Sequence, residues 1–195
     1  MEGKIFQIGF NKCGTTSLYK LFKEYCNPSN RLKCVHWDGG RVATAIEWHI
    51  TNNKKPILGR YHGFDYLGDM EYENEEGKKF IHMKYFKNLD TEYPNSRFIL
   101  NVRPIDEWIE SRKKHHSGNY LKHHAKTLRI SEEKVIELWK EQWENHMYSV
   151  CNYFAHRTNS LLIYDIKNDP FSKITDFFND LEFTIDRLPH QNKGF

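Results

Sequence analysis

The stretch that decides the fold is IGFNKCGTTSLYKLF, residues 8–22. The residues just before and into it, 4–9, are rich in isoleucine and phenylalanine and alternate in polarity, which predicts a short β-strand. Residues 15–25 carry apolar or aromatic side chains three and four positions apart, the spacing of an amphipathic helix. We therefore predict a strand, a glycine-containing loop and a helix in direct succession.

Two glycines, Gly9 and Gly14, enclose four residues of this loop, as in the phosphate-binding pattern G-x-x-x-x-G-K-[ST]. The lysine of that pattern is displaced, because Thr15 occupies its position and Lys12 lies three positions earlier. Backbone N–H groups and the helix dipole attract anions to a helix N-terminus. The loop is therefore predicted to hold a phosphate, with Lys12 able to reach the oxygen that bridges a 5′-phosphate and a transferred group.

The rest of the chain continues the alternation of strands and helices. We predict strands at 97–102 and 160–165, and helices at 41–52, 80–93, 104–114, 131–156 and 170–181. Residues 61–79 have no clear period and are expected to form a long loop with a turn. This order predicts a single domain over residues 1–195, a three-layer α/β/α fold of the P-loop type with a short central parallel sheet. The ligand is expected at the carboxyl ends of the strands.

Composition narrows the possible partners and compartments. The formal net charge of +3 fits a small anionic ligand, but the chain lacks the concentrated basic stripe expected of a nucleic-acid-binding protein. The four cysteines have no C-x-x-C spacing, which favours a reducing compartment. The apolar run at the start of the chain is too short for a signal peptide or a membrane anchor. We therefore expect a cytoplasmic protein without a nucleic-acid or membrane partner, and the oligomeric state is left open.

The loop GFNKCGTTSLYKLF resembles the 5′-phosphosulfate-binding loop of the P-loop sulfotransferases, whose usual form is Pro-Lys-Ser/Thr/Cys-Gly-Thr-Thr, with Asn11 in place of the common proline or glutamine. This family transfers a sulfuryl group from 3′-phosphoadenosine 5′-phosphosulfate to a hydroxyl or amine. The resemblance implies that Lys12 contacts the bridging oxygen and the transferred sulfonate, and that no metal is needed. The other donor-binding residues that it implies in this loop are Cys13, Gly14, Thr15, Thr16 and Ser17.

A second motif lies far away in the sequence, at SRFILNVRPIDEWIESR, residues 96–112. The family holds the 3′-phosphate of its donor with an arginine at the end of a strand and a serine eight residues later, and Arg103 and Ser111 have this spacing. An arginine offers a planar pair of donors that suits a phosphate. The tail LPHQNKGF resembles a late basic loop that closes over the 3′-phosphate or adenine, so Lys193 is a further candidate, with a solvated terminal lysine as the alternative.

The residue that takes the acceptor proton is less clear. LKCVHWDGGRVATAIEWHI, residues 32–50, resembles a segment of the heparan-type sulfotransferases in which a glutamate is the base, but Cys34 occupies that position. We expect His36 or Asp38 to take the role, with His36 favoured because imidazole titrates near neutral pH. The alternatives in the following loop are His62, Asp65 and Asp69.

Two other readings of the sequence stay open. A P-loop nucleotide kinase or triphosphatase would need a lysine at position 15, and a non-catalytic nucleotide-binding module would fit the missing glutamate at Cys34. The histidines of HHSGNYLKHH, residues 115–124, are expected to form a basic lid over the acceptor site and not a metal site. The acceptor itself is expected to be a small molecule or a carbohydrate.

Overall fold

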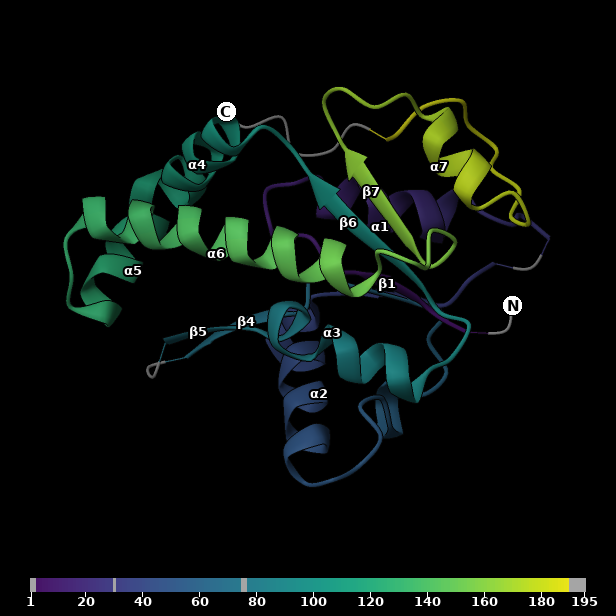
Figure 1. Cartoon of the computed structure of the whole chain (residues 1–195), viewed down its shortest axis with the longest axis horizontal. Coiled ribbons are helices and arrows are strands. Elements are labelled where there is room, and N and C mark those ends of the chain that lie inside the picture. The colour runs from purple at the N-terminus through teal and green to yellow at the C-terminus, as the bar shows by residue number, and fades with distance from the viewer. Residues whose placement is uncertain (1–2, 30, 75–76, 190–195) are drawn as a thin grey trace.

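The computed structural model describes residues 3–29, 31–74 and 77–189. A five-stranded parallel sheet lies at its centre (Figure 1). Its strand order is β2-β3-β1-β6-β7. The strands are β1 (Ile5–Gln7), β2 (Cys34–His36), β3 (Tyr66–Gly68), β6 (Arg97–Val102) and β7 (Leu161–Asp165). A separate antiparallel hairpin is formed by β4 (Glu71–Asn74) and β5 (Gly77–Phe80).

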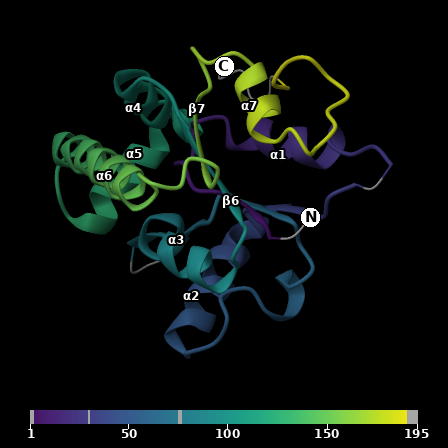
Figure 2. The ribbon, with the colours of Figure 1, turned by 45° about the vertical axis from the view of Figure 1, so that its right-hand side comes forward.

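Helices cover both faces of the sheet, as the two views of Figures 1 and 2 show. The helices are α1 (Thr15–Glu24), α2 (Arg41–Thr51), α3 (Ile81–Glu92), α4 (Ile105–Lys113), α5 (Asn119–Leu128), α6 (Glu132–Tyr153) and α7 (Ser172–Phe177). Phe6 and Ile8 of β1 and its extension pack with side chains of α2, α3 and α6, whereas Ile5 packs with α1 and α7 on the opposite face. This alternation along one strand produces two apolar cores and hence three layers.

A third, aromatic core lies where α4, α5 and the first half of α6 pack together beyond the sheet. Trp108 and Trp139 are fully buried there, and the guanidinium of the equally buried Arg112 lies 4.4 Å from the Trp108 ring centroid and 4.8 Å from that of Trp139. This core fixes the α4–α5 segment against the sheet, which matters because that segment forms one wall of the cavity described below. No helix of the described chain is long and apolar enough to cross a membrane.

The three-layer α/β/α prediction and the order of its main elements are confirmed. Ser131 caps α6, since its Oγ accepts a hydrogen bond from the Lys134 N–H at 3.3 Å. The prediction of one long loop over 61–79 was wrong, because this segment contains β3, β4 and the start of β5. Strands β2 and β3 have three residues each, too few to show a two-residue period, and α5 was also missed.

Gly9 is required by a close approach of the chain to Asn101 of β6. The Asn101 side chain accepts hydrogen bonds from the Gly9 N–H at 3.1 Å and from the Gln7 amide at 2.6 Å. A Cβ atom at position 9 would overlap both the backbone carbonyl and the side chain of Asn101. The start of the glycine loop is therefore held against Asn101 of the neighbouring strand β6.

We expect Gly9→Ala to lower the free energy of unfolding by about 3 kcal/mol, the upper part of the range for overpacking a buried position. The matched control is Gly63→Ala, because only the Lys33 ammonium comes within 4.0 Å of a Cβ at that position. The control should change stability by less than about 0.5 kcal/mol. Urea unfolding of both variants measures the difference, and equal stabilities would show that Asn101 does not restrict position 9.

Candidate functional site

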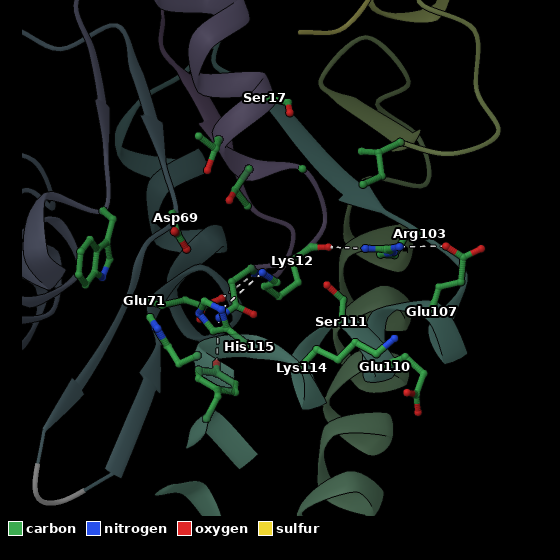
Figure 3. A pocket seen from close by; sticks show the side chains of 18 of the residues that line it. Lys12, Ser17, Asp69, Glu71, Arg103, Glu107, Glu110, Ser111, Lys114 and His115 are labelled. Carbon is green, nitrogen blue, oxygen red and sulfur yellow. Dashed lines mark hydrogen bonds and ion pairs between the residues drawn. The ribbon is translucent and has the colours of Figure 1, made fainter. Parts of the chain in front are cut away.

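A cavity of about 1130 Å³ opens at the carboxyl edge of the central sheet (Figure 3). A residue that lines it follows every one of the five parallel strands: Lys12 after β1, Trp37 after β2, Asp69 after β3, Arg103 after β6 and Ile166 after β7. Ligands of open α/β sheets bind at this edge, since the loops from several strands converge there. The topology therefore builds one binding cavity from segments that are far apart in the sequence.

The loop between β1 and α1 forms one wall of this cavity. Lys12 and Gly14 have left-handed φ values of 65° and 74°, and the buried Asn101 amide donates to the Cys13 carbonyl at 2.7 Å. Gly14 is the N-cap of α1, and the first N–H groups of a helix have no partner within the helix. Thr15, which begins α1, lines the cavity. The wall thus offers backbone donors and the positive end of the helix dipole to an anion.

Lys12 adds a positive charge beside this helix N-terminus. Its Nζ lies 3.4 Å from Nδ1 of His115, which comes from the segment after α4 (Figure 3). Burial lowers the pKa of Lys12, and the nearby Arg103 guanidinium lowers it further. A bound anion would relieve this unfavourable proximity of two positive groups, so the arrangement favours anion binding.

Arg103 connects the glycine loop to α4 across the cavity. Its Nη1 donates to the Lys12 carbonyl at 3.1 Å and its Nη2 donates to Glu107 Oε2 at 2.9 Å. The Arg103 Nε is buried and has no hydrogen-bond partner in the described part of the chain. Ser111 lies two turns along α4 and lines the same cavity (Figure 3). The pair forms a second group of donors, distinct from the helix N-terminus of α1.

Asn11 fixes the position of the loop through four hydrogen bonds. Its N–H donates to Glu71 Oε1 at 3.0 Å and its side-chain amide donates to the Tyr120 hydroxyl at 2.9 Å. It accepts from Arg112 Nε on its Oδ1 and from Trp108 Nε1 on its carbonyl, both at 3.0 Å. A proline at this position could make only the last of these bonds. Asn11 therefore ties the loop to β4, α4 and α5 at once.

The opposite half of the cavity is aromatic and acidic. Trp37 is 53 % exposed and has a left-handed φ of 57°, which is uncommon for a bulky residue. Asp69 also has a left-handed φ, of 51°, and Glu71 is a carboxylate that is only 6 % exposed. Non-glycine residues with left-handed φ cluster at functional sites, and Lys12 and His116 bring the number that line this cavity to four.

A comparison with protein-family models identifies this chain over most of its length. The model described as Sulfotransferase domain matches residues 4–185, which include every strand and helix given above. The chain is a member of the sulfotransferase family. A search of curated proteins found no match.

The structure brings together most of the residues predicted to bind the sulfotransferase donor. Lys12, Gly14, Thr15, Thr16, Ser17, Arg103 and Ser111 all line the one cavity. Cys13 does not line it: its thiol is fully buried in the aromatic core, and burial raises its pKa, so only its backbone belongs to the loop wall. Lys193 lies outside the described residues.

The two residues predicted to act as the base of the sulfotransferase, His36 and Asp38, do not line the cavity in the described part of the chain. His36 is mostly buried with its Nε2 3.5 Å from Asp69 Oδ2, and burial lowers the pKa of His36 to about 4, so the ring is neutral at pH 7. Asp38 accepts a hydrogen bond from the Tyr61 hydroxyl at 2.6 Å and one from Arg41 at 3.1 Å. Neither is among the described residues that line the cavity, whereas Asp69 is.

The remaining candidates lie elsewhere in the fold. His62 and Asp65 precede β3, at the amino edge of the sheet, where Asp65 Oδ2 accepts from the Lys33 N–H at 2.8 Å. Cys34 lies within β2, and burial raises the pKa of its thiol to about 12. No group of three or more possible metal ligands occurs among the described residues. His124 is buried and accepts from Trp139 Nε1 at 3.1 Å, so only His115 and His116 of that cluster line the cavity.

Three of the lining side chains carried no signal in the sequence. Glu71 belongs to the segment expected to be a loop, Trp37 follows a strand too short to be predicted, and Tyr120 lies in the helix that was missed. The departure from the family pattern at Asn11 was the one available clue, because an amide in place of a proline needs hydrogen-bond partners. It could not indicate which residues those partners are.

Proposed function

We propose that this sulfotransferase moves a sulfuryl group from 3′-phosphoadenosine 5′-phosphosulfate to a hydroxyl or amine of a small-molecule or carbohydrate acceptor. The observation that supports it best is that two groups of hydrogen-bond donors, each suited to bind a phosphate, line one cavity. The start of α1 with Lys12 would bind the 5′-phosphosulfate, and Arg103 with Ser111 would bind the 3′-phosphate. A nucleotide with phosphate groups at both its 3′ and its 5′ positions can contact both groups of residues. A nucleoside triphosphate carries all of its phosphates at one position and fits the two groups less well.

Lys12 has the role of stabilising the leaving group in this proposal. The acceptor oxygen or nitrogen forms a bond to sulfur while the bond from sulfur to the bridging oxygen breaks, and negative charge develops on that oxygen. A compact ammonium at the approach to the loop can stabilise this charge. The products are the sulfated acceptor and 3′-phosphoadenosine 5′-phosphate.

The proton of the acceptor must pass to a base at the cavity, and we propose Glu71 for this role. Its carboxylate is buried, lines the cavity and accepts from the N–H of Asn11, the residue next to Lys12. Figure 3 shows Glu71 and Lys12 on the same part of the cavity wall. His36 and Asp38 remain predictions, but neither is among the described residues that line the cavity, and the lowered pKa of His36 makes its imidazole a weak base, which favours Glu71 over them.

The 3′-phosphate assignment is tested by Arg103→Ala. We expect this variant to bind 3′-phosphoadenosine 5′-phosphate roughly 10- to 150-fold more weakly, since a charge-assisted hydrogen bond contributes about 1.5–3 kcal/mol. Adenosine 5′-phosphate, which differs only in lacking the 3′-phosphate, should lose much less affinity. Calorimetric titration measures both ligands, and Arg31→Ala, an exposed arginine away from the cavity, is the control. Equal losses for the two ligands would mean that Arg103 does not contact the 3′-phosphate.

A further inference from the structure

The half of the cavity that faces away from the proposed donor site has a chemical character of its own. It is formed by Trp37 and Thr44, from the segment that runs from β2 into α2, and by Asp69, Glu71 and Tyr72, from the end of β3 and from β4. The backbones of Trp37 and Asp69 are neighbours there, because the Trp37 N–H donates to the Gly68 carbonyl at 3.1 Å across the β2–β3 pair. The Asp69 carboxylate lies 3.5 Å from His36 Nε2 on its inner side and also lines the cavity. An acceptor that approaches Lys12 from this side meets these side chains.

The positive side chains of the cavity are unevenly placed. Among the described residues, the lysines and arginines that line it are Lys12, Arg103, Lys114 and Lys167, and the donor side also holds the carboxylates of Asp106, Glu107 and Glu110. Arg103 and Lys167 both contact Glu107, on the proposed donor side, and Figure 3 shows Lys114 extending beside Ser111 and Glu110, away from Asp69.

The acceptor half contains the carboxylates of Asp69 and Glu71 and, among the described lining residues, no lysine or arginine other than Lys12. The imidazole of His115 is placed to accept a hydrogen bond from the Lys12 ammonium, which requires an unprotonated Nδ1. An anionic acceptor would have to bring its charge next to the two carboxylates, one of which is buried.

The exposed indole of Trp37 complements these carboxylates. The face of a tryptophan ring attracts cations more strongly than that of any other side chain. An aromatic face beside a carboxylate is an arrangement that binds a protonated amine, through a cation–π contact and an ion pair together. A lysine already makes such a cation–π contact with another exposed tryptophan of the chain, since Lys54 Nζ lies 4.4 Å from the Trp48 ring centroid.

We propose that the acceptor is an alcohol or phenol that also carries a protonated amine, which binds between Trp37 and Asp69 while the hydroxyl reaches Glu71 and Lys12. This inference rests on the proposed function and adds the class of the acceptor to it. It disfavours polyanionic acceptors, such as sulfated or uronate-containing glycans, which the heparan-type resemblance at residues 32–50 would suggest. In the transfer step the hydroxyl proton passes to the Glu71 carboxylate and the acceptor oxygen bonds to sulfur.

The test uses matched acceptors that differ only in charge. Tyramine, 4-ethylphenol and 4-hydroxyphenylacetate form one set, and glucosamine, glucose and glucuronate form a second. With labelled donor, we expect kcat/KM for the cationic member of at least one set to exceed that of the neutral member by roughly tenfold, the scale of a desolvated cation–π contact. We expect it to exceed the anionic member by roughly 100-fold, because like charges brought together cost several kcal/mol.

Variants connect this preference to the two residues. Trp37→Ala and Asp69→Asn should each reduce the ratio of cationic to neutral kcat/KM toward one, and Trp37→Phe should retain part of it. Trp48→Ala and Asp176→Asn are the controls, since Trp48 is 50 % exposed, nearly as much as Trp37, and Asp176 lies on α7 away from the cavity. A merely structural role of Trp37 would lower all three rates together and leave the ratio unchanged, which would count against the proposal.

Binding of 3′-phosphoadenosine 5′-phosphate separates failure of this inference from failure of the proposed function. If this nucleotide does not bind and no set is sulfated, the proposed function fails. If it binds but the anionic members are used or bound as well as the cationic ones, only the acceptor inference is overturned. If it binds and no member is turned over, calorimetry on the nucleotide-bound protein decides: preferential binding of a cationic member supports the inference, and no binding of either cationic member overturns it.

Discussion

Replacing Lys12 by alanine is expected to lower kcat by roughly 10²- to 10³-fold, the typical cost of removing one donor that stabilises developing negative charge. Lys12 is half-buried, lies beside Arg103 and sits at the approach to the helix N-terminus of α1. If its ammonium acts on the bridging oxygen, its effect is larger in the transition state than in the ground state. Binding of 3′-phosphoadenosine 5′-phosphate should change much less, since the backbone donors of the loop remain.

Two further variants make this prediction specific. Lys12→Arg should not restore full activity, because a planar guanidinium cannot take the place of a compact ammonium at a single bridging oxygen. Lys55→Ala, which removes an exposed lysine beyond α2, should leave kcat unchanged. Single-turnover rates with bound donor measure the effect, with donor hydrolysis as the reaction until an acceptor is known. A folded Lys12→Ala protein that binds the donor and keeps a near-normal rate would show that Lys12 does not stabilise the leaving group and is only a binding residue.

Glu71→Gln is expected to lower kcat by roughly 10²- to 10⁴-fold, the contribution typical of a general base. The amide oxygen can still accept the Asn11 N–H bond that Glu71 Oε1 accepts at 3.0 Å, so the loop should keep its position. Donor binding should therefore be retained while proton transfer is lost.

His36→Asn and Asp38→Asn distinguish the possible bases, and Glu92→Gln, an exposed glutamate at the end of α3, is the control for an amide in place of a carboxylate. Because the pKa of His36 is lowered to about 4, its imidazole is a weak base, and His36 does not line the cavity in the described part of the chain, so its variant should keep most of the activity. The same is expected for Asp38, whose carboxylate accepts hydrogen bonds from Tyr61 and Arg41. A Glu71→Gln protein as active as the wild type, together with an inactive His36→Asn protein, would place the base at His36.

Local sequence patterns were sufficient to predict residues that line the half of the cavity that we propose binds the donor. The glycine loop with Lys12 and the strand-to-helix segment with Arg103 and Ser111 each have their spacing within about ten residues, so backbone geometry alone determines how these side chains lie relative to one another. The parallel sheet then brings the two segments together, since β1 and β6 are adjacent. The three-layer architecture followed from the same alternation of strands and helices.

The half of the cavity that we propose binds the acceptor depends on contacts that no local pattern encodes. Glu71 meets Asn11 across 60 positions of sequence, and Trp37 is placed by a hydrogen bond to Gly68 between two three-residue strands. Strands this short show no periodicity, so their pairing could not be predicted and neither could the residues at their ends. His36 was favoured as the base on its intrinsic pKa, but burial is a property of the folded chain, and it lowers that pKa to about 4.

The most direct test of the donor assignment is a calorimetric titration of the protein with 3′-phosphoadenosine 5′-phosphate in the presence of EDTA, beside a titration with ATP and magnesium. The two groups of phosphate donors at Lys12 and at Arg103 predict that the bisphosphate binds without a metal, binds more tightly than ATP with magnesium, and raises the melting temperature by mass action. Binding of ATP with magnesium that is equal or tighter, or no binding of the bisphosphate, would contradict the account.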